Sequence, residues 1–101
     1  MSITVVVRRR ARPGEGTHLI VTGVHLLEER ATRGEPLDIA RVFQSLSTPD
    51  DVLFVSVWAD RAAYWASLQE NSAEQQLDAL CVSEPEQYFF RQLALDENAD
   101  R

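Results

Sequence analysis

The chain has 101 residues, 45% hydrophobic and 26% charged, with a formal net charge of −6. This length allows one domain, and the composition is that of a soluble globular protein rather than a disordered or collagen-like chain. No apolar run approaches the ~18 residues of a membrane span. A pI of about 4.8 argues against non-specific nucleic-acid binding. The single cysteine, Cys81, cannot form an internal disulfide, so we expect a cytoplasmic protein.

The first half of the chain predicts a strand, a helix and a second strand. The β-branched run 3–10 (ITVVVRRR) indicates a strand that ends at the turn 12–14 (RPG). Helical periodicity follows from residue 15 to about residue 33, and Gly34 and Pro36 end it. Residues 37–46 are assigned to a strand despite imperfect alternation. The apolar face of the helix is predicted to hold Ile20, Val24, Leu27 and Ala31, widened by Leu19 and Leu26.

The second half predicts the same order of elements. Residues 52–58 (VLFVSVW) form the most strand-like run in the chain and follow a turn cluster at 47–51. Asp60 is expected to N-cap a second helix, which a capping box at 72–75 (SAEQ) restarts. Residues 88–95 (YFFRQLAL) predict the last strand, and residues 96–101 are expected to form a polar tail. One domain, 1–95, and a tail, 96–101, therefore make up the chain.

The element order β-α-β-β-α-β is typical of an α+β, ferredoxin-like fold. It predicts a four-stranded antiparallel sheet with both helices on one face. Strand 52–58 is apolar on both faces, because Phe54 and Trp58 point one way and Leu53, Val55 and Val57 the other. Since the helices cover only one face, we expect a second copy of the sheet to cover the other, in a homodimer. The alternative is a monomer with a partly exposed apolar sheet.

The pattern resembles the antibiotic biosynthesis monooxygenase family of dimeric α/β barrels. The matching segments are the first strand, 12–14 (RPG), 45–51 (SLSTPDD) and 57–63 (VWADRAA), in fitting order and spacing from residue 3 to residue 95. The resemblance implies a homodimer with a pocket between helices and sheet in each subunit. Activities in this superfamily include cofactor-independent oxidation of polyphenolic anthrones, quinol oxidation, haem degradation and small-molecule isomerisation.

Haem degradation of the family's type is disfavoured. Haem-degrading relatives carry an asparagine, a tryptophan and a histidine where this chain aligns Val7, Ser67 and Leu77. Leu77 cannot ligate iron, and neither Val7 nor Leu77 can donate a side-chain hydrogen bond.

The anthrone-oxidising relatives imply a different set of site residues. Their pocket tryptophan aligns with Trp58 and their pocket tyrosine with Tyr64, which makes both candidate catalytic residues, with core packing as the alternative for each and the favoured one for Trp58. Their pocket asparagine falls on Phe54, which lacks the amide and is expected to narrow the pocket. Tyr64 lies one turn into its helix, so its side chain should lean towards the pocket and donate a hydrogen bond to the ligand.

Two polar clusters have alternative interpretations. His18, Thr22, His25 and Glu29 share a helical stripe, but histidines seven residues apart lie ~10 Å apart along a helix and cannot share one ion. This stripe is interpreted as solvated; alternatively, His25 contacts a ligand or acts as a general base at the pocket mouth. The arginines at 8, 9, 10 and 12 are interpreted as partners of surface carboxylates, with steering of an anionic ligand as the alternative. Alternation puts Arg9 on the opposite face from its two neighbours.

These observations favour a cofactor-independent monooxygenase that acts on a flat aromatic polyphenol or quinol. Tyr64 and Trp58 are the candidate catalytic residues, and Phe54, Tyr64 and His25 the candidate substrate contacts. The sequence has no cofactor or metal motif, so no cofactor is expected. A non-catalytic dimeric protein that binds a small hydrophobic or aromatic ligand, and an isomerase or cyclase with the same pocket, are the alternatives.

Overall fold

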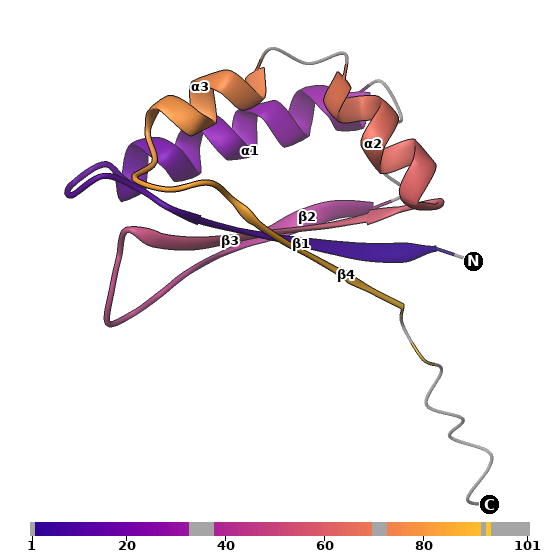
Figure 1. Cartoon of the computed structure of the whole chain (residues 1–101), viewed down its shortest axis with the longest axis horizontal. Helices are drawn as coiled ribbons and strands as arrows, with labels where there is room; N and C mark the ends of the chain where they lie inside the picture. Colours follow the sequence, from indigo (N-terminus) through magenta and orange to yellow (C-terminus); the bar gives the residue numbers. More distant parts are fainter. Residues whose placement is uncertain (1, 33–37, 70–72, 92, 94–101) are drawn as a thin grey trace, which may run out of the picture.

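The computed structural model describes residues 2–32, 38–69, 73–91 and 93. Four antiparallel strands form one sheet in the order β2-β3-β1-β4, and the helices lie on one face of it (Figure 1). The predicted ferredoxin-like fold is confirmed, with the second helix divided in two. The elements are β1 (Ile3–Arg10), α1 (Gly16–Thr32), β2 (Asp38–Gln44), β3 (Asp51–Trp58), α2 (Arg61–Gln69), α3 (Ala73–Ala79) and β4 (Glu86–Phe90).

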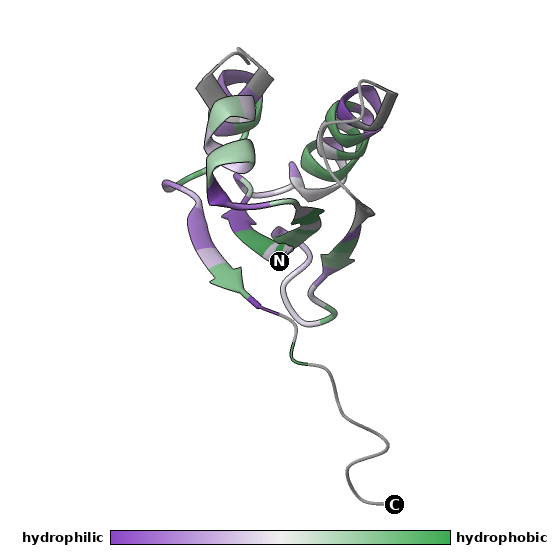
Figure 2. Ribbon diagram, turned by 90° about the vertical axis from the view of Figure 1, so that its right-hand side faces the viewer, coloured by the Kyte–Doolittle hydropathy of each residue, from purple (hydrophilic) through white to green (hydrophobic). Residues whose placement is uncertain are grey.

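The helices form a single layer. Viewed along the sheet in Figure 2, α1 makes one column and α2 with α3 the other, both above the same face. In the part of the chain that the structure describes, no helix has the length and apolarity needed to cross a membrane.

Capping contacts fix where the helices begin. The backbone N–H of Gly16, the first residue of α1, donates to Asp50 Oδ1 at 2.9 Å, and the N–H of Gly14 donates to Asp50 Oδ2 at 3.2 Å. Gly14 has a φ of 82°, a left-handed conformation that glycine adopts without steric cost. The predicted N-cap of α2 is confirmed, because Asp60 Oδ1 accepts from the N–H of Ala63 at 2.8 Å. The predicted cap at Ser72 lies outside the described residues.

Two strand boundaries differ from the prediction. The prediction of a last strand over 88–95 is wrong at both ends, because β4 begins at Glu86 and ends at Phe90. Its ladder with β1 runs from Arg8–Glu86 to Thr4–Phe90, one residue short of the start of β1, and residues 92 and 94–95 lie outside the described part. Strand β2 ends at residue 44 rather than 46, and residue 37, its predicted start, lies outside the described residues. A register shift between Asp38 and Arg41 explains its imperfect alternation. The predicted tail, 96–101, also lies outside the described residues.

The buried face of α1 is rotated from the one predicted. Ile20 and Val24, placed at its centre by the prediction, are only half-buried. The prediction is confirmed for Leu19, Leu26 and Leu27. It was wrong in placing Ile20 and Val24 on the buried face, because it counted apolar residues alone, whereas a glycine and an arginine also point inward. The buried residues on this stripe are Leu19, Gly23, Leu26, Leu27 and Arg30.

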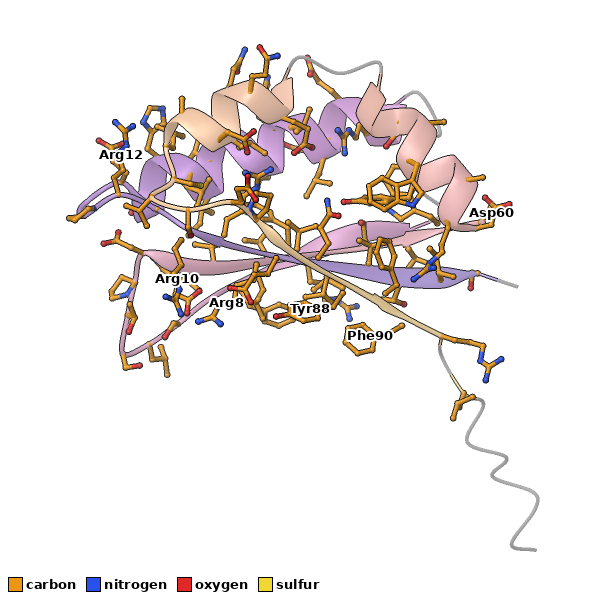
Figure 3. The ribbon with its side chains drawn as sticks, in the orientation of Figure 1. Arg8, Arg10, Arg12, Asp60, Tyr88 and Phe90 are labelled. Atoms are coloured by element: carbon orange, nitrogen blue, oxygen red, sulfur yellow. The ribbon has the colours of Figure 1, made fainter. Side chains whose placement is uncertain are left out.

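The two faces of the sheet differ in what covers them. Along β3, Val52, Phe54, Ser56 and Trp58 are buried under the helices, and the residues between them point away, as predicted. The face away from the helices carries Leu53, Val55 and Val57 with the exposed rings of Phe43 (51%), Tyr88 (43%) and Phe90 (53%). Tyr88 and Phe90 project from this open face in Figure 3, as does Arg8.

Candidate functional site

A cavity of about 40 Å³ lies between the sheet and the helices. It has room for one or a few water molecules and is smaller than the ~150 Å³ that has been shown to hold a benzene molecule. Every element except β2 contributes to it. Its lining residues are Val7, Arg9, Gly23, Leu26, Leu27, Arg30, Phe54, Ser56, Tyr64, Glu74, Leu77 and Gln87.

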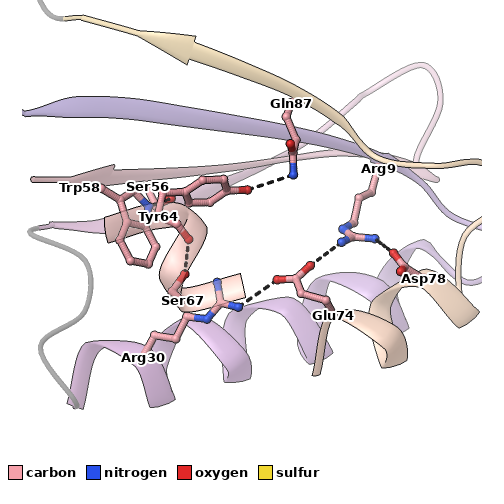
Figure 4. Close-up of polar contacts among 9 residues, drawn as sticks. All are labelled: Arg9, Arg30, Ser56, Trp58, Tyr64, Ser67, Glu74, Asp78 and Gln87. Carbon is pink, nitrogen blue, oxygen red and sulfur yellow. Dashed lines mark hydrogen bonds and ion pairs between the residues drawn. The ribbon is translucent and has the colours of Figure 1, made fainter. Parts of the chain in front are cut away.

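Tyr64 is buried and places its hydroxyl group at this cavity. The hydroxyl oxygen accepts a hydrogen bond from Gln87 Nε2 at 3.3 Å (Figure 4). Burial disfavours the phenolate, and the nearby charge of Glu74 adds to this, so the pKa of Tyr64 rises to about 12. The phenol is therefore neutral at neutral pH. Because no contact between described residues uses its hydrogen, it is a ready hydrogen-bond donor.

Trp58 packs behind Tyr64 and does not line the cavity. Its side chain is 1% exposed, and the two rings meet edge to face with centroids 5.4 Å apart. The indole N–H donates to Ser56 Oγ at 2.7 Å. Ser56 and Tyr64 both line the cavity, so the contacts of Trp58 fix the positions of two lining residues.

Phe54 lines the cavity and fills part of the space below α1. Its ring lies against Gly23, where an added Cβ would be 2.5 Å from Cζ and would overlap Cε1. A side chain at position 23 would therefore meet the ring, and only glycine lets Phe54 pack this close. The structure thus brings Phe54 and Tyr64 together at one cavity, as the sequence predicts.

A buried ion cluster forms the polar wall of the cavity. Glu74 accepts from Arg9 Nη2 at 2.6 Å and from Arg30 Nη2 at 3.0 Å, and Arg9 Nη1 donates to Asp78 at 2.6 Å (Figure 4). Both arginine side chains are 3% exposed. Burial alone would lower the pKa of Arg9, but the hydrogen bond to Asp78 and the charge of Glu74 raise it above its ordinary value. The guanidinium group of Arg9 therefore stays charged.

Sequence reasoning missed Arg30, Glu74 and Gln87 as cavity residues. A signal for Arg30 exists, because it lies seven residues after Gly23 on the stripe that also holds Leu19 and Leu26. Glu74 similarly lies three residues before the buried Leu77. Charged residues on such stripes are usually left out of a predicted core, since they are seldom fully buried unless paired.

Neighbouring arginines of β1 point to opposite faces of the sheet, as alternation predicts. Arg9 points into the cavity, whereas Arg8 lies on the open face, where its Nη2 contacts Asp51 Oδ2 at 2.6 Å. Pairing with carboxylates is thus observed for both residues.

The histidines lie away from the interior cavity. His25 is exposed on α1 and lines a groove of about 680 Å³ beside α3, together with Glu28 and Gln76. His18 contacts Glu15 at 3.1 Å, so this stripe is solvated, as expected. Across the described ranges, no three His, Cys, Asp or Glu side chains are grouped in a way that could hold a metal ion.

Comparison with known proteins relates the chain to solved structures. SnoaB from Streptomyces nogalater, a cofactor-independent oxygenase solved as a single-residue variant, matches with a TM-score of 0.77 and 17% identity over 95% of this chain and 98% of its own. The fold is that of the antibiotic biosynthesis monooxygenases. A Chloroflexus aurantiacus protein that bears this family's name matches with a TM-score of 0.70 and 22% identity over 93% and 95% of the two chains.

A conserved protein from Methanosarcina mazei Go1 also matches, with a TM-score of 0.74 and 18% identity over 92% and 94% of the two chains. No family model matches the chain, and neither does any curated protein. At these identities the likeness is one of fold, so activity has to be argued from the cavity itself.

Proposed function

We propose that this chain is a cofactor-independent monooxygenase that acts on a flat aromatic polyphenol or quinol. The observation that carries the proposal is Tyr64, a buried and neutral hydrogen-bond donor at a cavity between sheet and helices. The fold shared with SnoaB, itself a cofactor-independent oxygenase, supports it.

The reaction class suits a cavity of this kind. An anthrone or quinol can react with dioxygen through its own carbanion, so the protein need only promote loss of a proton, orient the substrate and exclude water. In the oxidation of an anthrone, one oxygen atom becomes the new carbonyl and the other leaves as water. Tyr64 would donate to the substrate carbonyl oxygen, on which negative charge develops. Trp58 would act as a positioning residue through its contact with the ring of Tyr64.

The size of the cavity defines the second candidate function. A cavity of about 40 Å³ does not hold a whole aromatic ring, so full enclosure of the substrate ring would require Phe54 or its neighbours to move. The same narrow cavity suits a non-catalytic protein that binds a small ligand. The loss of an amide also favours this function, because Phe54 stands where anthrone-oxidising relatives have an asparagine. Turnover distinguishes the two functions.

The test is aerobic incubation with a panel of anthrones, quinols and flavins, followed by oxygen uptake and product mass. The monooxygenase should consume oxygen with an anthrone or quinol and yield a product that has gained one oxygen atom and lost two hydrogen atoms, and Tyr64→Phe should slow it. Ligands that raise the melting temperature without oxygen uptake would contradict the monooxygenase and favour the binding protein.

We also propose that the protein is a homodimer whose subunits pack their open sheet faces together. Support comes from Val55, which lies in the middle of that face, and from the exposed rings of Phe43, Tyr88 and Phe90 around it. Covering such a face would remove a large apolar area from water. Sedimentation at micromolar concentration should give twice the monomer mass, and Val55→Glu should give the monomer. Val82→Glu, at an exposed site outside the sheet, is the matched control.

His25 remains a candidate ligand contact, but in the outer groove rather than the interior cavity. His25→Ala should weaken ligand binding only if that groove takes part, and unchanged binding would remove His25 from the site. A cytoplasmic location is proposed on the basis of the unpaired, buried Cys81.

A further inference from the structure

The interior cavity carries more positive than negative charge. Two guanidinium groups, Arg9 and Arg30, face one carboxylate, Glu74, whose side chain is 25% exposed. The other carboxylate of the cluster, Asp78, contacts Arg9 at 2.6 Å from outside the lining and is 56% exposed. Burial of a cation is costly unless an anion compensates it, and among the residues that line the cavity Glu74 is the one carboxylate beside the two guanidinium groups.

One donor of this wall has no acceptor. Arg30 Nε is buried and makes no hydrogen bond with any described residue. Leaving a buried N–H unsatisfied destabilises a protein, and such groups in folded proteins call for a specific explanation. A ligand atom that accepts hydrogen bonds would satisfy it.

The remaining polar groups of the cavity also offer hydrogens. The neutral hydroxyl of Tyr64 and the side-chain amide of Gln87 meet at 3.3 Å (Figure 4). Glu74 already accepts from two arginines. Arg30 Nε–H and the hydroxyl hydrogen of Tyr64 are therefore donors without a partner among the described residues, and such donors are complementary to an oxygen anion.

The lining also indicates where a ligand would enter. Glu74, Gln87 and Val7 keep partial exposure, whereas the other lining residues are buried. The cavity therefore meets the surface between α3 and β4. Its volume of about 40 Å³ accepts an oxygen-bearing edge of a ligand more readily than a whole ring.

We infer that the cavity binds an aromatic ligand as its oxyanion, with the ionised oxygen of an acidic phenol or enol held by Arg30 and Arg9. The inference rests on the proposed function and defines its substrate class as compounds with an acidic hydroxyl group. On binding, the O–H bond breaks, its electron pair stays on the ligand oxygen, and the proton passes to the buffer. Arg30 supplies the unsatisfied Nε–H, and Glu74 is the internal anion with which the ligand competes.

The probe is 4-nitrophenol, which ionises near neutral pH and is yellow only as the phenolate; its methyl ether, 4-nitroanisole, is the control ligand. Absorbance titration of the full-length protein with each probe gives the affinity and the pKa of the bound phenol. We expect the bound phenol to ionise about one pKa unit lower than the free phenol, a tenfold preference for the anion. Calorimetry in buffers of different ionisation enthalpy should detect the released proton, and 4-nitroanisole should bind at least tenfold more weakly.

Two variants, one that removes a positive charge and one that removes a negative charge, distinguish this role from a structural one. Arg30→Gln should abolish the preference for the anion, whereas Glu74→Gln removes the competing carboxylate and should strengthen phenolate binding. Arg12→Gln, an exposed arginine in the turn before α1, should change neither. Urea unfolding of each variant establishes that it is folded. If Arg30→Gln does not fold, Arg30→Lys is measured in its place; this variant keeps the charge and should retain part of the preference for the anion.

The outcomes distinguish this inference from the proposed function. Absent binding, binding of the neutral phenol, or equal binding of 4-nitroanisole would overturn the oxyanion site. Equal weakening of phenolate binding by Arg30→Gln and Glu74→Gln would do the same, because it would make the cluster purely structural. If the phenolate binds as expected but no anthrone or quinol causes oxygen uptake, the monooxygenase is refuted and the oxyanion site stands.

Discussion

The contact between Gly23 and Phe54 tests how tightly the cavity is packed. In an exposed helix, Gly23→Ala would stabilise the protein by about 1 kcal/mol because alanine has the higher helix propensity. In this structure the new Cβ would overlap Phe54 Cε1 and lie 2.5 Å from Cζ and 3.2 Å from Cδ1. Three atoms of one rigid ring are involved, so the ring has to move as a unit.

The expected cost follows from where the ring can go. Overpacking a core costs about 1–3 kcal/mol, and the upper end applies because the space beside the ring is small. The cavity of about 40 Å³ is the free volume next to Phe54, and it admits only a short displacement. Subtracting the gain in helix propensity leaves a net loss of about 2 kcal/mol in the free energy of unfolding. The displaced ring should also reduce the space for 4-nitrophenol.

Urea unfolding in a double-mutant cycle measures this contact directly. Gly23→Ala should cost about 2 kcal/mol in the wild type and markedly less when Phe54 is already leucine. Val21→Ala, at an exposed position of α1, is the control and should change stability by less than about 0.5 kcal/mol. A stabilised Gly23→Ala variant, or a cost that is the same with leucine at position 54, would refute the packing argument.

Three further predictions concern single side chains. Tyr64→Phe should fold normally and weaken ligand binding or turnover by about 1 kcal/mol; ultraviolet titration should show that the transition near pH 12 is lost. Because the pKa of Tyr64 is raised from 10.0 to about 12, its contribution to wild-type stability is complete below pH 10 and is lost as the pH rises towards 12, a loss that the variant should lack. Trp58→Phe should lower the free energy of unfolding by roughly 1–3 kcal/mol in urea, because its ring and its hydrogen bond to Ser56 are buried. Arg8 lowers the pKa of Asp51 below its ordinary 3.8, so the ion pair stabilises the protein above that pH and this stabilisation is lost on further acidification. In Asp51→Asn the loss of stability at acidic pH should be smaller than in the wild type, by at most about 1 kcal/mol, as measured by thermal unfolding at a series of pH values.

The fold could be predicted because its signals are local. Alternation along residues 52–58 separates Phe54 and Trp58 from Leu53, Val55 and Val57, and the structure has this division. Turn residues mark the ends of the other elements, and Asp60 marks the start of α2. The end of β4 could not be found in this way, because its ladder with β1 ends at Thr4–Phe90 although no turn residue follows Phe90 before Asp96.

The site was predictable only in part. The spacing of Tyr64 from its cap places it at the cavity, and the replacement of the family's asparagine indicates that Phe54 narrows it. The ion cluster depends on contacts far apart in sequence, such as Arg9 with Glu74, which are 65 residues apart. No local period pairs residues at such a separation. The contact of Phe54 with Gly23 could not be predicted from the sequence either, because a glycine in a helix has no side chain that would count in an apolar pattern.

The proposed oxyanion site gives the small size of the cavity and its unpaired donor a common explanation. A cavity meant to enclose a whole polycyclic ligand would need several hundred Å³ of mostly apolar space, far more than Phe54 leaves. A ligand that inserts only an oxygen-bearing edge needs little volume but strong donors, and Arg30 and Tyr64 supply these. Under this arrangement Phe54 limits how deep the ring can enter, while Glu74 and Gln87 border the opening through which the rest of the ligand extends. In the proposed oxyanion site, the narrow cavity and the unpaired buried donor are two parts of the same recognition site.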